Sequence, residues 1–239
     1  MKIYKSLLFT LLAIFSANQL SAHALWIETN TIGKAGQQHE IKIFYGEYVN
    51  NEKEKIEKWY SDVKEFTLWL TAPGKEKVKL NTVAKDDYFS ANFTPEKDGV
   101  YFITVAHEAK DLGGTTKYEF SSVATVAVGK SNAVDLNSVS NSLKVSTADA
   151  KVYKANAPVQ LKAVLNGKPL ANKHVSVFSP EGWGKEFTTD ANGVINFSPI
   201  WPGRYVVEAS NFVKNGGEHN GKEYKAEWQG ATSSFEVVK

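Results

Sequence analysis

The stretch Val100-Tyr101-Phe102-Ile103-Thr104-Val105 shows the pattern that decides the fold of this chain. It is rich in β-branched and aromatic side chains and has a period of two, as a half-buried β-strand does. The same period appears in residues 40–45 and 66–70. Similar runs occur at residues 122–128, 159–164, 174–178, 194–197, 205–209 and 234–238.

Dipeptides typical of turns separate these runs. They are Pro73-Gly74, Asp98-Gly99, Asn166-Gly167, Asn192-Gly193 and Pro202-Gly203. Many short strands at fairly regular spacing are typical of β-sandwiches, so we expect an all-β protein.

One short segment has a helical pattern instead. After Asn50-Asn51, apolar residues recur at the spacing i, i+3, i+4, i+7, namely at Ile56, Trp59, Tyr60 and Val63. This pattern predicts a helical insertion of one to three turns that covers one end of the first sandwich. A solvated, charged loop is the alternative.

The first 22 residues have the features of a secretory signal peptide. Lys2 and Lys5 precede an apolar run over residues 7–15, and small and polar residues follow up to Ala22. The run is short for a membrane anchor, which is the alternative interpretation, and no second apolar segment of spanning length follows it. We therefore expect export to the periplasm and a mature chain that does not span the membrane. Cleavage after Ala22 would leave His23 first, and cleavage after Ala24 would leave Leu25 first.

Composition excludes several classes of function. The chain has no cysteine, so thiol-based metal sites and cysteine nucleophiles are excluded. Without Lys2 and Lys5 the basic residues number 26 and equal the 26 acidic residues, so nothing indicates a nucleic-acid partner. The common catalytic and nucleotide-binding motifs are also missing. We expect a binding protein with no organic cofactor rather than an enzyme.

A polar, turn-rich segment divides the chain. Gly129-Lys130-Ser131-Asn132 ends one series of strands, and residues 137–142 are again polar. We therefore predict a signal peptide over residues 1–22, an N-terminal β-sandwich over 23–129, a linker over 130–141 and a C-terminal β-sandwich over 142–239.

The second predicted domain carries a recognisable series of motifs. Asn166-Gly167-Lys168-Pro169-Leu170 is followed by Thr189-Asp190-Ala191-Asn192-Gly193, then Phe197, then Pro202-Gly203-Arg204-Tyr205. This series resembles the signature of small prealbumin-like and Ig-like sandwich modules. The resemblance implies two such sandwiches in tandem after a cleaved signal peptide, and it implies a fold rather than a chemistry.

With the N-terminal sequence Ala22-His23-Ala24-Leu25-Trp26-Ile27, the chain as a whole is similar to a broader family. This family comprises periplasmic two-domain proteins similar to the soluble component associated with nickel and cobalt uptake. Its members often keep a histidine at the start of the mature protein, which matches His23. Many have Gly-His where this chain reads Gly46-Glu47. The resemblance implies a carrier or accessory of a metal uptake system, with an inner-membrane transporter as partner.

A metal site is the sharpest hypothesis that these residues support. Cleavage after Ala22 would give His23 a free α-amine beside its imidazole, and one more histidine would make three nitrogen donors suited to Cu(II) or Ni(II). His107 shares its strand phase with Tyr101, Ile103 and Val105, so it points toward the same core. Glu47 could add a carboxylate. The predicted ligands of Ni(II), Co(II) or Cu(II) are therefore His23, His107 and Glu47.

Two other functions stay open from the sequence. A metal-free periplasmic module could recognise a glycan or a protein through loops such as the one carrying Trp183. An N-terminal histidine with a second histidine on a β-sandwich is also the copper brace of polysaccharide mono-oxygenases. In the metal-free case His107 would be a buried structural histidine and His23 an exposed terminal residue.

Overall fold

The computed structural model describes residues 23–239, so the predicted signal peptide and its cleavage sites up to Ala22 lie outside the described residues. The prediction of an all-β protein is confirmed. The first half contains β1 (Ala24–Thr29), β2 (Ile32–Gly33), β3 (His39–Glu47), β4 (Glu52–Lys53), β5 (Leu68–Thr71), β6 (Lys77–Leu80), β7 (Val83–Ala84), β8 (Tyr88–Phe93), β9 (Gly99–Glu108) and β10 (Thr116–Val128).

The second half continues with strands only. They are β11 (Leu143–Thr147), β12 (Tyr153–Lys154), β13 (Val159–Leu165), β14 (Lys168–Pro169), β15 (His174–Phe178), β16 (Gly184–Thr188), β17 (Val194–Phe197), β18 (Gly203–Val213), β19 (Gly217–His219), β20 (Lys222–Tyr224) and β21 (Ala226–Val238). The helices of the described chain are single 3-10 turns: η2 (Tyr48–Asn50), η3 (Ile56–Lys58), η4 (Val63–Glu65) and η5 (Leu136–Ser138). Within residues 23–239 no helix is long and apolar enough to cross a membrane.

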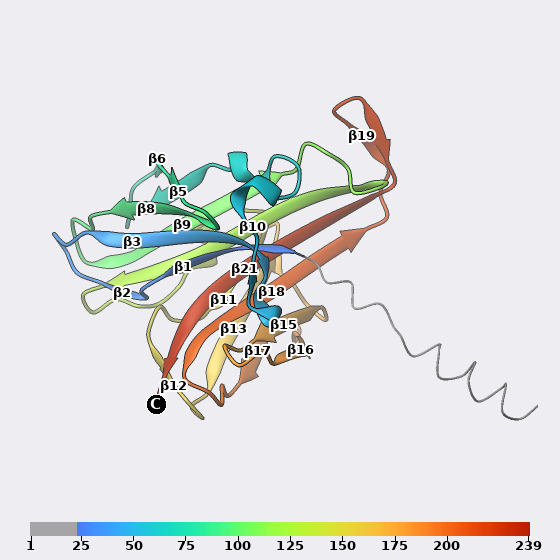
Figure 1. Cartoon of the computed structure of the whole chain (residues 1–239). Helices are drawn as coiled ribbons and strands as arrows, with labels where there is room; N and C mark the ends of the chain where they lie inside the picture. The colour runs from blue at the N-terminus through green and yellow to red at the C-terminus, as the bar shows by residue number, and fades with distance from the viewer. Residues whose placement is uncertain (1–22) are drawn as a thin grey trace, which may run out of the picture.

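One large sheet runs through both halves. Its strand order is β16-β15-β18-β21-β10-β9-β5-β6, and β10 pairs with β21 in parallel, from Thr116 with Ala226 to Ser122 with Thr232. Figure 1 shows these two long strands side by side at the centre of the molecule. A smaller sheet, β1-β3-β8-β7, faces the large sheet in the first half, and the sheet β11-β13-β14 faces it in the second.

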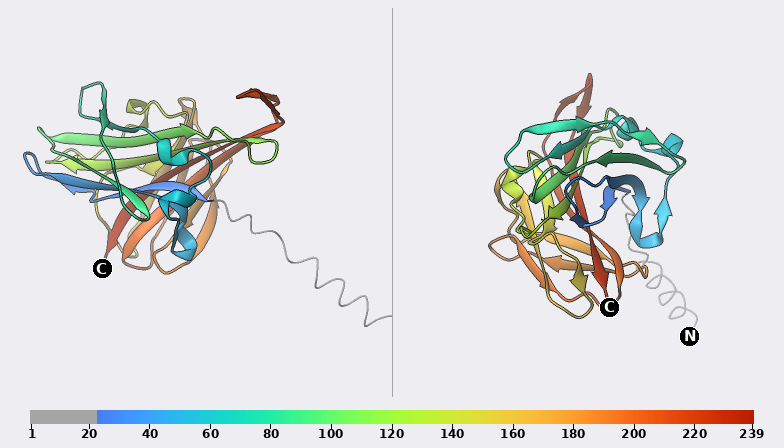
Figure 2. Two further views of the ribbon diagram at one scale, coloured as in Figure 1. Left: turned by 45° about the horizontal axis from the view of Figure 1, so that its top comes forward. Right: turned by 90° about the vertical axis from the view of Figure 1, so that its left-hand side faces the viewer.

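Each smaller sheet buries its own apolar core against the large one. The first core joins odd-numbered residues of β1 and β3, such as Leu25 and Ile43, to Ile103 and Val105 of β9. The second joins Val145 and Leu161 to Val207 and Phe235. Figure 2 shows the long strand β21, in red, between the strands of the first half and those of the second. This arrangement is the sandwich architecture that period-two strands favour.

The predicted linker is packed rather than extended. Its residues Val134, Leu136 and Val139 are buried in a cluster with Ala150 and with Phe102, Val123 and Ala127 of the large sheet. The division into domains at residues 130–141 stays a prediction.

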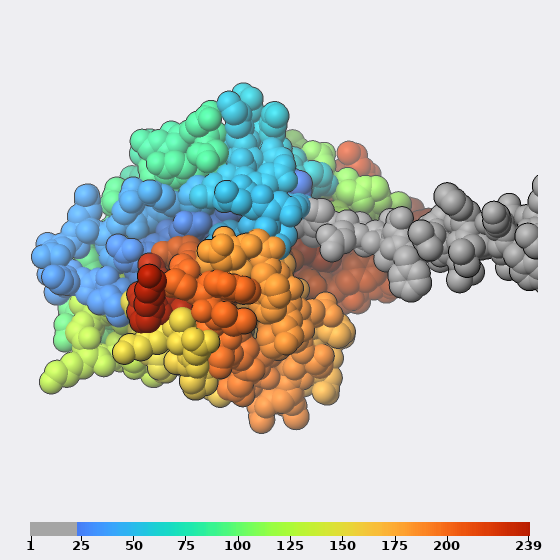
Figure 3. Space-filling model, turned by 60° about the horizontal axis from the view of Figure 1, so that its bottom comes forward, coloured from blue at the N-terminus to red at the C-terminus, as the bar shows by residue number. Residues whose placement is uncertain are grey.

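Strand β1 also contacts the second half of the chain. The hydroxyls of Thr232 and Ser234 donate to the carbonyls of Leu25 and Ile27 at 2.6 and 2.7 Å, and Trp26 packs with Phe44 and Val206. The segment after β3 likewise meets the second half (Figure 3), and the Tyr48 hydroxyl donates to the carbonyl of Arg204. The start of the described chain is therefore held between the two halves.

The prediction of a helical insertion after Asn50-Asn51 is wrong, because the segment contains no continuous helix. The segment consists of β4 and the separate turns η3 and η4, with Ser61 in the left-handed region at φ 51°. The apolar residues still face the first core, since Trp59 and Val63 are buried and Ile56 and Tyr60 pack against it. The indole of Trp59 donates to the carbonyl of Glu54 at 3.0 Å, an anchor that a periodicity pattern does not reveal.

Candidate metal centre

One group of potential metal ligands stands out in the described chain. Ligand atoms of His23, Glu52 and Glu54 all lie within 4.8 Å of one another. His23 Nε2 is 3.2 Å from Glu54 Oε1, and both side chains are partly exposed. Glu52 is exposed, so an ion in solution can reach the group.

Strand pairing brings these three residues together. Gly46 near the end of β3 pairs with Ala24 of β1 and with Lys53 of β4. The first described residue, His23, and the short strand β4 therefore flank the same end of β3. Because side chains alternate along a strand, Glu52 and Glu54 share one face while Lys53 points the other way and lies over the Phe44 ring at 4.0 Å.

Gly46 makes the approach of β4 possible. Its φ is 148°, a conformation that L side chains rarely adopt, and a Cβ there would lie 2.4 Å from the carbonyl oxygen of Glu52. Glycine at this position thus lets β4 lie against the end of β3, and the amide of Glu54 donates to the carbonyl of Tyr45 at 2.9 Å.

The ring of Tyr45 packs beside the group. Its ring lies 5.4 Å from the His23 ring and belongs to the first core. Burial, followed by the nearby charges of Tyr60 and Glu54, raises the pKa of the Tyr45 phenol well above its usual range. The phenol therefore stays protonated and acts as a wall rather than as an anionic ligand.

The donor set fits a transition metal. One imidazole nitrogen and two carboxylate oxygens suit divalent first-row ions, including Ni(II), Co(II) and Cu(II). The existing His23–Glu54 contact already places the imidazole Nε2 beside a carboxylate oxygen that would bind the same ion.

The predicted ligands occupy three different surroundings. His23 belongs to the group, and Glu47 is the cross-strand partner of Glu52, but its buried carboxylate accepts a hydrogen bond from Asn50 at 2.5 Å. His107 lies outside the group. Its Nε2 is 3.0 Å from Asp62 Oδ1, which also accepts from the amide of Lys110.

That contact gives His107 a structural partner. Burial opposes ionisation of Asp62, but the hydrogen bonds from His107 and from the Lys110 amide outweigh it and lower the pKa of this carboxyl. His107 therefore ties the loop of Asp62 to the end of β9.

Sequence reasoning missed Glu52 and Glu54. The signal was present as Glu52-Lys53-Glu54, where alternation places two carboxylates on one face. We did not expect a strand there, because the residues that follow have a helical pattern. Trp183, which the metal-free alternative invoked, is partly buried and packs edge-on against Trp201 with ring centroids 6.0 Å apart.

No family model and no curated protein match this sequence. Two of the solved structures that resemble it are an adhesin and a membrane-anchored protein. A Ca²⁺-stabilized adhesin that helps an Antarctic bacterium reach out and bind ice aligns at 12% identity with a TM-score of 0.25, over 90% of this chain and 49% of that one. A protein from Corynebacterium diphtheriae described as membrane anchored aligns at 12% identity with a TM-score of 0.24, over 90% of this chain and 53% of that one.

This chain thus spans about half the length of each of those two proteins. Likenesses at TM-scores this low say nothing about the function of the chain. The resemblance to nickel- and cobalt-uptake proteins stays a prediction.

Proposed function

We propose that this protein binds one divalent transition metal, Ni(II), Co(II) or Cu(II), through His23, Glu52 and Glu54. The observation that supports this most directly is the convergence of the three ligand atoms within 4.8 Å at one end of β3. The role that fits is a periplasmic carrier or accessory of a metal uptake system, with an inner-membrane transporter as the partner that receives the ion.

Each residue has a distinct part in capture. The neutral His23 imidazole supplies nitrogen, and the carboxylates of Glu52 and Glu54 offset the charge of the ion. Partial exposure of His23 and Glu54 and exposure of Glu52 suit exchange with a partner better than permanent retention. Because a protonated imidazole cannot bind, protons compete with the ion and affinity should fall as the pH drops.

The site of leader cleavage matters for this proposal. Cleavage after Ala22 would add the α-amine of His23 as a further nitrogen donor, whereas cleavage after Ala24 would remove His23 altogether. A chain that begins at His23 is therefore the form to test.

Isothermal titration with Ni(II), Co(II) and Cu(II) tests the proposed ligands. We expect one ion per chain, and Glu54→Gln should weaken binding at least about tenfold, or roughly 1.4 kcal/mol. Glu57→Gln is the matched control, because Glu57 is an exposed carboxylate of the same segment outside the group. Equal affinity of the two variants would overturn the assignment.

A further inference from the structure

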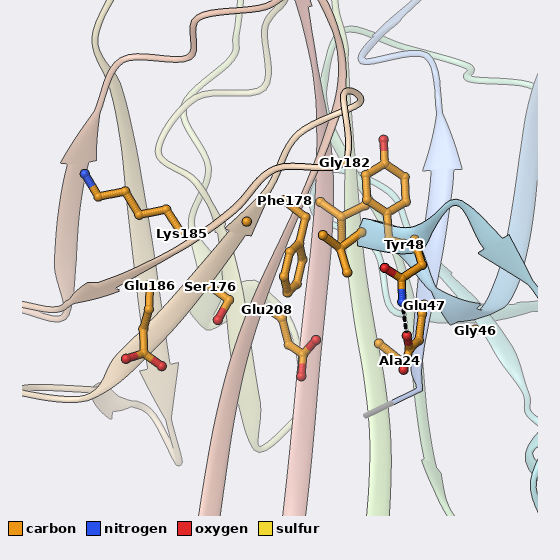
Figure 4. Close-up of a pocket in the computed structure, with 14 residues that line it drawn as sticks. Ala24, Gly46, Glu47, Tyr48, Ser176, Phe178, Gly182, Lys185, Glu186 and Glu208 are labelled. Atoms are coloured by element: carbon orange, nitrogen blue, oxygen red, sulfur yellow. Dashed lines mark hydrogen bonds between the residues drawn. The ribbon is translucent and has the colours of Figure 1, made fainter. Parts of the chain in front are cut away.

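A second feature, distinct from the metal group, is a cavity of about 630 Å³ between the two halves. Its walls come from the start of β1 and the end of β3 with η2 on one side, and from β15, β16 and β18 on the other (Figure 4). The lining side chains that carry charge are Glu47, Lys185, Glu186 and Glu208.

Glu208 is the side chain in this cavity without a partner. It lies on β18 opposite Ser176 of β15, which in turn lies opposite Glu186 of β16. Among residues 23–239 no hydrogen bond or ion pair reaches its carboxylate, and burial alone raises its pKa to about 7. Its side chain is only partly buried and lines the cavity, so its carboxylate is open to a ligand that enters there.

The other charged side chains have neighbours of their own. Glu47 accepts from Asn50, and Glu186 pairs with His174 at 3.1 Å. Lys185 lies over the Phe187 ring at 5.0 Å, and Figure 4 shows it pointing away from Glu208. Three carboxyl groups and one lysine therefore line the cavity, which has a net negative charge once Glu208 is ionised.

The walls beside Glu208 are aromatic and small. Phe178 stands next to it in Figure 4, and Tyr48 lines the opposite side. Carboxylate and aromatic faces together suit an organic ammonium group, whose charge the carboxylate neutralises and whose alkyl part packs on the rings. A metal ion fits less well, because none of the cavity's carboxylates belongs to the group of converging ligand atoms in the described chain.

We propose that this cavity binds the ammonium group of a small aliphatic amine, with Glu208 as its counter-ion and Phe178 against its alkyl chain. The proposal does not depend on the metal site. The same chemistry could come from a free amine or from the α-amine of the processed chain, since Ala24 lines the cavity and directly follows His23.

Calorimetric titration of the chain beginning at His23 with 1,4-diaminobutane tests the proposal. We expect binding at pH 8 that Glu208→Gln weakens at least about tenfold, whereas Glu223→Gln, an exposed carboxylate outside the cavity, leaves it unchanged. Because the empty carboxyl has a pKa of about 7, the wild-type affinity should fall about tenfold from pH 8 to pH 6, with proton release on binding.

A second arm separates the two sources of the amine. If 1,4-diaminobutane binds only after the α-amine is acetylated, the chain's own terminus occupies the cavity. Absence of binding by both forms would overturn the proposal. In the acetylated chain, where the α-amine can neither bind the ion nor enter the cavity, Ni(II) binding by Glu208→Gln should match that by the wild type, so failure here and failure of the metal site are distinguishable.

Discussion

At the scale of single residues, Glu208 is the described carboxyl whose pKa burial raises. Its raised pKa means that folding favours the protonated carboxyl, from an ordinary value of 4.5 to about 7. The stability that this group contributes is therefore complete below about pH 4.5 and is lost as the pH rises through 7.

This predicts a measurable pH dependence. In the absence of amines, the free energy of unfolding should fall between pH 5 and pH 8 by up to about 3 kcal/mol, and Glu208→Gln should remove most of that slope. Urea unfolding at both pH values measures it. A wild-type chain whose stability is the same at both would show that the carboxyl finds a partner.

His107 is the opposite case, because its side chain contacts a carboxylate. Sequence phase correctly predicts that it lies at the end of a strand, but phase alone does not show that Asp62 is 3.0 Å away. The carboxylate of Asp62 comes from the turn before η4, in the segment that was wrongly predicted to be a regular helix.

His107→Gln should therefore act on stability and not on metal binding. We expect a loss of about 1 kcal/mol from the weakened contact with a partly exposed carboxylate. Ni(II) affinity should stay within about twofold of the wild type. Loss of metal binding in a folded His107→Gln chain would restore this residue as a ligand.

At the scale of elements, the metal group depends on the two-residue strand β4. Such a strand is too short for any periodicity to predict, whereas the long strands β9, β10, β18 and β21 follow directly from their β-branched and aromatic runs. The turn at Asn166-Gly167 was equally predictable, because both residues adopt positive φ (51° and 74°) there.

The importance of β4 can be tested at Gly46. Gly46→Ala would place a Cβ against the carbonyl of Glu52, so we expect a loss of roughly 1–3 kcal/mol and a metal affinity at least about tenfold weaker. Gly36→Ala is the control. Gly36 also has positive φ, at 75°, but a Cβ there meets nothing within 4 Å, so metal binding should survive.

At the scale of the whole molecule, one sheet runs through both halves of the chain. The parallel pairing of β10 with β21 and the hydrogen bonds from Thr232 and Ser234 to β1 join segments more than a hundred residues apart. Sequence patterns located the strands of both halves but gave no sign of this pairing, because strand order depends on packing between distant runs.

We therefore predict a single cooperative unfolding transition for residues 23–239. Two independent sandwiches would instead unfold in two steps. Differential scanning calorimetry distinguishes these cases by comparing the calorimetric with the van't Hoff enthalpy. A resolved second transition would show that the halves are separate domains despite the shared sheet.

Native mass spectrometry of the exported chain, with and without one equivalent of Ni(II) or Cu(II), tests the metal site most directly. The account predicts a mass beginning at His23 and one retained ion, which is lost in Glu54→Gln and kept in Glu57→Gln. A mass beginning at Leu25, or no ion retained at stoichiometric loading, would contradict it.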